Sequence, residues 1–122
     1  MFSFYKGKTP IEKELPATAS TVYNVGDALV YGSAGTIVKA TGTTKPEFIC
    51  AGVSGDVVVG QVIEEDMEFA TTLSASGTSL KLGNKVTIGT DGDNVTATTT
   101  NGVAEIIEIH GTSVGDEVIV KF

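Results

Sequence analysis

The sequence predicts an all-β protein, a small β-barrel or β-sandwich of about ten short strands with an extended N-terminal arm. Three observations lead to this prediction. Glycine accounts for 15 of the 122 residues, and glycine is the residue that turns with positive φ require. Short apolar runs of strand length are separated by turn residues roughly every 8–12 positions, as in sandwiches and barrels. The third observation is an internal repeat.

One glycine-rich segment occurs twice. Residues 25–41 recur at residues 82–98, an offset of 57 positions, without a gap. Gly26, Gly32 and Gly35 fall on Gly83, Gly89 and Gly92. A tight turn, a short strand, a second glycine turn and a return strand explain this pattern. Flanking similarity extends the predicted duplication to residues 25–59 and 82–120, so we expect two similar sheets or half-barrels related by a rough two-fold.

Residues 1–20 differ from the remainder and are predicted to form an arm, while residues 21–122 form a single β domain. Three of the eight aromatic residues fall within the first five positions: Phe2, Phe4 and Tyr5. Pro10 and Pro16 interrupt regular structure in the arm. Two interpretations stay open. The arm is either a first strand paired onto the domain, or a segment whose aromatic side chains anchor on a partner, each contributing roughly 1.5–3 kcal/mol when buried.

The first half of the body begins with the hairpin of residues 25–41. Residues 47–53 are apolar on both faces, which predicts a strand that is covered on both sides. The elements that follow are a turn, a strand, an acidic turn and a strand, at residues 54–56, 57–63, 64–66 and 67–73. A Ser/Gly-rich connection at residues 74–79 then joins the two halves.

The second half contains the clearest hairpin signal. Asn101-Gly102 is flanked by residues 95–100 and 103–109, and Asn-Gly is the preferred pair for a type I′ turn of two residues. Residues 115–120 parallel residues 55–59, and they predict a last strand that brings the C-terminus into a sheet. Helix content should be low, about one turn.

Composition excludes several partners and compartments. The net charge is −7, and all eight basic residues are lysine, which argues against nucleic acid and against an anionic membrane surface. The single Cys50 has no partner for an internal disulfide, so no oxidising compartment is implied. The N-terminus lacks the apolar region of a signal peptide, and no stretch reaches the length of a membrane span. We therefore expect a protein that is made and kept, or assembled, in a cytoplasm.

The sequence contains no convincing catalytic constellation. His110 is the only histidine, and it lies at a predicted strand end, where a surface role is the simplest interpretation. No Gly-x-Ser-x-Gly elbow is present, because Gly32-Ser33-Ala34-Gly35 does not match that pattern. Cys50 lies within an apolar run, which predicts an unreactive core thiol. We expect no enzymatic activity and no catalytic residue, and a small hydrolase built around His110 is the least favoured alternative.

The acidic segments do not form a recognisable metal site. Asp91-Gly92-Asp93-Asn94 resembles the start of a calcium loop, but Val95 occupies the position of a third oxygen ligand and no glutamate follows at the required distance. A glycine turn explains these residues without a metal. The carboxylates of residues 64–68 are expected to be solvated. No P-loop is present either, so no metal or cofactor is predicted.

Four segments together resemble a known family. The arm is followed by Val-Gly-Asp-x-Leu-Val at residues 25–30 and Gly-x-Ile-Val-x-Ala at residues 35–40. Phe-Ile-Cys-Ala-Gly-Val at residues 48–53 and Val-Gly-Asp-Glu-Val-Ile-Val-Lys-Phe at residues 114–122 complete the pattern. From residue 25 to residue 122, the chain resembles the small β-rich head decoration proteins, or capsid cement proteins, of tailed bacteriophages.

The resemblance implies a structural virion protein that binds the outer surface of a phage capsid, with the major capsid protein as partner. It would be assembled in the host cytoplasm and would bridge neighbouring capsid subunits. Trimers are common in such families, and monomeric decorators also occur. An N-terminal arm often contacts the shell, which makes five residues the predicted partner site: Phe2, Phe4, Tyr5, Lys6 and Lys8. A glycan- or host-binding module on a virion surface or tail is the alternative, although the chain has no tryptophan.

Overall fold

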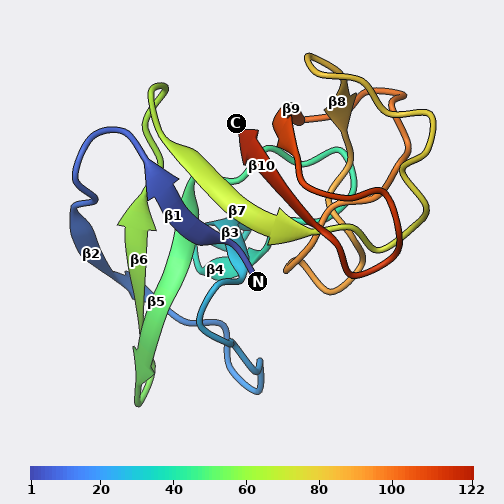
Figure 1. The fold of residues 1–122 in the computed structure, drawn as a ribbon. Helices are drawn as coiled ribbons and strands as arrows, with labels where there is room; N and C mark the ends of the chain where they lie inside the picture. Colours follow the sequence, from blue (N-terminus) through green and yellow to red (C-terminus); the bar gives the residue numbers. More distant parts are fainter.

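The computed structural model describes residues 1–122 as ten strands in two five-stranded antiparallel sheets, without a helix (Figure 1). Both sheets are open, with two outer strands each. The all-β prediction is therefore confirmed, and the arrangement fits a sandwich rather than a closed barrel.

Each sheet takes one outer strand from the first 20 residues. Sheet A has the strand order β1-β7-β10-β9-β8. Its strands are β1 (Ser3–Lys6), β7 (Glu68–Thr72), β10 (Glu117–Lys121), β9 (Ala104–Ile109) and β8 (Lys85–Val86). Sheet B has the strand order β2-β6-β5-β3-β4. Its strands are β2 (Glu12–Pro16), β6 (Val57–Val62), β5 (Phe48–Ser54), β3 (Ala28–Tyr31) and β4 (Ile37–Lys39).

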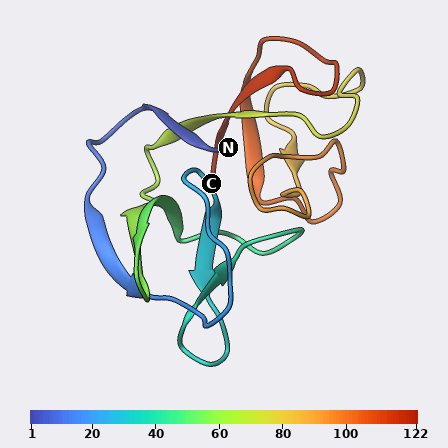
Figure 2. The same ribbon diagram turned by 90° about the horizontal axis from the view of Figure 1, so that it is seen from below.

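The N-terminal arm is built into both sheets. β1 pairs with β7, with Phe4 opposite Phe69, and β2 pairs with β6, with Leu15 opposite Val58. Figures 1 and 2 show the arm, in blue, running from the edge of sheet A to the edge of sheet B. Of the two interpretations of the arm, the structure thus shows strands paired onto the domain.

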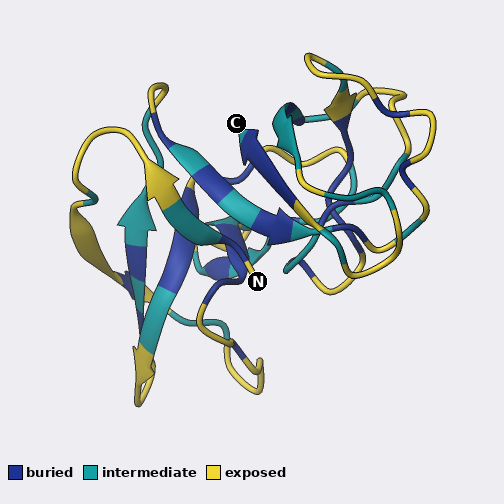
Figure 3. Cartoon of the chain, viewed as in Figure 1, coloured by how far each residue is buried: buried dark blue, intermediate teal, exposed yellow.

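The core consists of two clusters of buried side chains. The larger cluster, of 15 residues, joins the two sheets, because Ala28 and Ile49 of sheet B pack in the same cluster as Phe69 and Val118 of sheet A. The smaller cluster, of seven residues, includes Leu15, Leu29 and Phe48 of sheet B. Figure 3 shows the buried residues in dark blue along β5, β7 and β10. Burial alternates along β7, which is the period of two that strand geometry imposes.

A four-residue turn with one hydrogen-bond pattern occurs three times, at Gly26-Asp27, Gly83-Asn84 and Gly115-Asp116. The φ angles of the glycines are 91°, 89° and 89°. Within each turn, the Asp or Asn N–H donates to the carbonyl three residues earlier, at 3.0, 3.1 and 3.0 Å. The Asp or Asn side-chain oxygen accepts the N–H of that earlier residue at 2.8, 2.9 and 3.0 Å.

The same three turns are anchored to neighbouring segments in one way. The glycine N–H donates to a residue of an adjacent strand or strand end, and that residue's N–H donates back to the Asp or Asn carbonyl. The three anchoring residues are Cys50, Ile106 and Leu73. The sequence repeat predicts only two of these turns, because it aligns Gly115-Asp116 with Gly55-Asp56. The latter pair forms a hairpin turn between β5 and β6, in which Ser54 pairs with Val57.

The two repeated hairpins differ by one residue. Tyr31 pairs with Ile37 in the first, which leaves five residues in the turn, whereas Ile88 pairs with Val95 in the second, which leaves six. The N–H of the second turn glycine donates to the carbonyl of the first at 3.0 Å in both hairpins. The offset of 57 residues therefore holds through the glycine turn and shifts by one residue in the return segment.

The prediction of an Asn-Gly hairpin around residues 101–102 is wrong, because residues 95–100 do not pair with residues 103–109. β9 pairs with β8 and β10, and within residues 95–100 only Val95 forms bridges. Asn101 does have the positive φ of a turn residue, at 55°. Gly102 packs against the main chain of Lys85, where any Cβ would clash. Local turn preference is satisfied, but contacts with distant strands decide the pairing.

Candidate functional site

The five predicted partner residues divide into an inner and an outer group. Phe2 is 1% exposed, and its ring lies edge-on to that of Phe122, with centroids 5.5 Å apart. Phe4 packs edge-on against Phe69, with centroids 6.2 Å apart. These two rings thus fix the arm to its own domain. The partner role of the set stays a prediction, and its accessible members are Tyr5, Lys6 and Lys8.

The outer group forms a small polar and aromatic surface along β1. Tyr5 is 43% exposed, and the Lys6 ammonium lies 5.8 Å from the centroid of its ring. Tyr5 occupies the irregularity in the pairing of β1 with β7, and such bulges redirect side chains at sheet edges. Lys8 lies at the end of this surface, where its ammonium contacts Glu64 at 3.0 Å. Glu64 raises the pKa of Lys8, through a hydrogen bond first and charge second.

The two outer strands contributed by the arm are also the accessible edges of the two sheets. The opposite edge of sheet B, at β4, is flanked by a parallel bridge from Ala17 to Ile37. The opposite edge of sheet A, at β8, continues into Thr87, which exchanges main-chain hydrogen bonds with Thr96 and Thr98. The edges left for another strand therefore belong to β1 and β2.

The two arm edges differ in how they are protected. β2 ends at Pro16 and carries alternating charges at Glu12, Lys13 and Glu14, all exposed. Proline and charged side chains are common devices against edge-to-edge pairing. β1, with the sequence Ser-Phe-Tyr-Lys, has no proline and a single charged residue, Lys6, beside the bulge at Tyr5. β1 is therefore the less protected of the two arm edges and the better suited to accept a partner strand.

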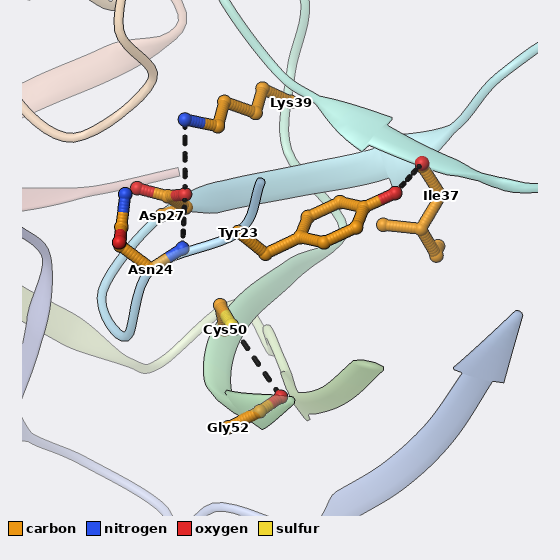
Figure 4. Close-up of polar contacts among 7 residues, drawn as sticks. All are labelled: Tyr23, Asn24, Asp27, Ile37, Lys39, Cys50 and Gly52. Carbon is orange, nitrogen blue, oxygen red and sulfur yellow. Dashed lines mark hydrogen bonds and ion pairs between the residues drawn. The ribbon is translucent and has the colours of Figure 1, made fainter. Parts of the chain in front are cut away.

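A buried polar cluster lies beneath the first repeated hairpin (Figure 4). Asp27 is 1% exposed. Its Oδ2 accepts the Asn24 N–H at 2.8 Å and lies 3.3 Å from the Lys39 ammonium. Nearby, the Tyr23 hydroxyl donates to the Ile37 carbonyl at 2.7 Å and accepts the Thr18 N–H at 2.8 Å. These contacts satisfy buried polar groups and fasten the loop after β2 to β4, which is a structural role.

Cys50 lies in the same region and is an unreactive thiol by its environment. The side chain is buried, and its Sγ donates a weak hydrogen bond to the Gly52 carbonyl at 3.7 Å (Figure 4). Burial is the main cause that raises the pKa of the Cys50 thiol, and the neighbouring Gly52 backbone only partly opposes this effect. A raised pKa disfavours the thiolate, which is the nucleophilic form.

His110 lies on the surface between two carboxylates. Its Nε2 is 2.9 Å from Glu108 Oε1, and its Nδ1 is 2.8 Å from Glu117 Oε1. Hydrogen bonds to Glu108 and Glu117 raise the pKa of His110. The imidazolium is favoured because only the charged form donates from both nitrogens. The imidazole therefore has no free nitrogen to act as a base in this conformation.

The calcium-like segment is a glycine turn. Gly92 has a φ of 74°, and its carbonyl accepts the Ala28 N–H at 2.7 Å. Asp93 Oδ1 and Asn94 Oδ1 are buried without a hydrogen-bond partner. No three His, Cys, Asp or Glu side chains lie close enough together to hold a metal ion.

Comparisons with known proteins do not assign the chain. No family model matches the chain, and no curated protein matches it either. The structure contains no helix of sufficient length and apolar character to cross a bilayer. The likeness to capsid decoration proteins therefore rests on the sequence motifs themselves.

Sequence reasoning located the arm but missed which of its surfaces is accessible. The clustering of aromatic residues treats Phe2, Phe4 and Tyr5 alike. The burial of Phe2 and the packing of Phe4 against Phe69 show that these two rings point inward. The sequence does contain a signal that favours β1, because β2 ends in proline and carries three charged residues whereas β1 carries one.

Proposed function

We propose that the protein is a structural virion protein that binds the outer surface of a phage capsid and stabilises it by bridging neighbouring major capsid subunits. The sequence motifs that resemble capsid decoration proteins motivate this proposal. The single structural observation that supports it is the accessible edge of β1, the less protected of the two arm edges, which is bordered by the exposed Tyr5 and Lys6.

The chemistry of that edge suits a protein partner. A strand added beside β1 gains main-chain hydrogen bonds, each contributing about 0.5–1.5 kcal/mol net. Tyr5 offers an aromatic ring to a partner pocket, which is the usual character of an interface anchor. Because Phe2 and Phe4 hold β1 against β7, the edge is already in the extended form that a partner needs, and little ordering entropy is lost on binding.

Co-sedimentation with undecorated phage heads tests the proposal. Wild-type protein is expected to saturate at a stoichiometry set by capsid symmetry. The variant Tyr5→Ala/Lys6→Ala removes the aromatic anchor and the charge beside it. It is expected to bind at least about tenfold more weakly, a loss of about 1.4 kcal/mol in binding free energy. Deletion of residues 1–20 is unsuitable, since it removes an outer strand from both sheets.

The matched control changes an apolar residue and a lysine at the other edge. Ile11 is 59% exposed beside β2, and Lys13 lies within β2, also exposed. The variant Ile11→Ala/Lys13→Ala should keep wild-type binding. Absence of wild-type binding to any shell would remove the proposed function, and equal loss in both variants would remove the assignment to β1.

A further inference from the structure

Two adjoining hollows of opposite charge meet at Phe122. The first, of about 460 Å³, includes three glutamates in its lining, and the second, of about 300 Å³, includes three lysines and one glutamate. The glutamates of the first are Glu47, Glu64 and Glu65, and the lysines of the second are Lys45, Lys85 and Lys121. Lys45 and Phe122 line both hollows, so the two form one continuous surface with an acidic half and a basic half.

The basic half is unusual for this chain. The net charge is −7 with only eight lysines, and three of them line one hollow. Lys8 and Lys39 each have a carboxylate partner, at 3.0 and 3.3 Å. None of the three lysines of the basic half takes part in an ion pair. Positive charge is thus concentrated at one place, where Glu105, opposite both Lys85 and Lys121 in the strand register, is the one carboxylate of the hollow.

We infer that this surface is a contact between two copies of the chain, related by a two-fold axis near Phe122. A two-fold interface must be complementary to itself, because each copy presents the same patch. Rotation about an axis at the shared residues lays the basic half of each copy on the acidic half of the other. Phe122, which is half-buried, then lies at the apolar centre of a polar rim, the usual anatomy of an interface.

A second copy explains the surface better than an unrelated acidic partner. An acidic segment from another protein satisfies the lysines but leaves the adjoining glutamates facing a like charge. A second copy satisfies both halves at once, with the chain's own Glu47 and Glu65 as the ligands of Lys85 and Lys121. The contact adjoins the outer group of the arm, because Glu64 of the acidic half pairs with Lys8 at 3.0 Å, but it includes neither Tyr5 nor Lys6.

The affinity of the inferred contact should depend on salt concentration. Its charged side chains are largely exposed, and exposed ion pairs are individually weak and screened by salt. We therefore expect a weak dimer at low ionic strength and a dissociation constant at least about tenfold higher at 500 mM salt. Sedimentation equilibrium of the full chain at 20 and 500 mM salt measures both.

Charge reversal provides the decisive test. The variant Lys85→Glu/Lys121→Glu makes both halves acidic, and Glu47→Lys/Glu65→Lys makes both halves basic. Each is expected to be monomeric alone, while an equimolar mixture should form dimers. Attraction between the net charges of the two variants would not explain dimers in the mixture, because both variants are negative overall. Their net charges are −11 and −3, four below and four above −7. All four positions lie outside the core clusters. Lys85 and Lys121 both stand opposite Glu105, so Lys85→Glu/Lys121→Glu should melt at a lower temperature than wild type, and circular dichroism at the temperature of the sedimentation run checks that each variant is folded.

The matched control is Lys6→Glu/Lys81→Glu, which gives the same net charge of −11 from a wild-type value of −7 at exposed positions outside both hollows. It should dimerise as wild type does. Four results would overturn the inference: a monomeric wild type at 20 mM salt, a dimer that persists in both reversed variants, a mixture that stays monomeric, or assembly beyond a dimer. Binding of a hexaglutamate peptide by a wild type that does not self-associate would instead indicate an acidic partner.

Discussion

At the residue scale, the glycines of the turns at Gly26-Asp27, Gly83-Asn84 and Gly115-Asp116 show why one position decides a local structure. Gly83 has a φ of 89°, and nothing lies within 4 Å of the place where a Cβ would stand. Space is therefore not the constraint there, and the backbone conformation is. A non-glycine residue in the left-handed region costs about 1–2 kcal/mol. The turns at Gly26-Asp27 and Gly83-Asn84 could be predicted from the sequence, because the need for a positive φ at the glycine is a local property of the backbone.

His110 gives a prediction about pH at the same scale. The pKa of His110 is raised in the folded protein by Glu108 and Glu117, whereas the unfolded chain titrates near about 6.5. A raised folded pKa means that the folded state binds the proton more tightly. The added stability is therefore fully present below about pH 6.5 and is lost as pH rises through the folded pKa.

Two measurements check this expectation. His110 is the only histidine, so its single imidazole signal in an NMR titration should report a pKa above the ordinary value. The melting temperature of wild type relative to His110→Gln should be higher at pH 5 than at pH 9. A difference that stays constant across this range would show that the two carboxylate contacts do not persist in solution.

At the element scale, the arm is the part whose role the sequence left undecided. The aromatic clustering and the two prolines marked residues 1–20 as distinct, and this much was predictable. Whether the segment would pair with its own sheets depended on β6 and β7, which lie more than 40 residues further along the chain. Pairing over such distances is set by packing, and no local pattern encodes it.

The buried and exposed aromatic residues of β1 should respond differently to truncation. Phe2→Ala should destabilise the protein by about 3–5 kcal/mol, because it leaves a cavity in the larger core cluster. Tyr5→Ala should cost about 1 kcal/mol or less, because its ring is at the surface. Urea unfolding monitored by circular dichroism gives both values. Equal and small effects would mean that the arm is detached from the domain in solution.

At the scale of the whole molecule, the duplication did not produce two equal halves. The first repeated unit supplies β3 and β4 of sheet B, while the second supplies only the short β8 of sheet A and isolated bridges. The fold class, the turns and the first hairpin were predictable because glycine spacing and apolar periodicity are local. The distribution of strands between the sheets was not, because β7 from the first half lies between β1 and β10.

The two halves of the chain should consequently depend on each other for folding. Sheet A takes β1 and β7 from the first half and β8, β9 and β10 from the second, and the larger core cluster draws on both. The connection at residues 74–79 is held by main-chain hydrogen bonds, including one from the Gly77 N–H to the Thr112 carbonyl at 2.7 Å. A chain divided there exposes the apolar face of every strand that remains in sheet A.

Fragments 1–76 and 77–122 are therefore each expected to give the poorly dispersed amide spectra of unfolded chains, and mixing them should restore the dispersion of the intact protein. A well-dispersed spectrum from either fragment alone would mean that the duplicated units are independent folding units, with the shared core a consequence of their docking rather than the condition for their folding.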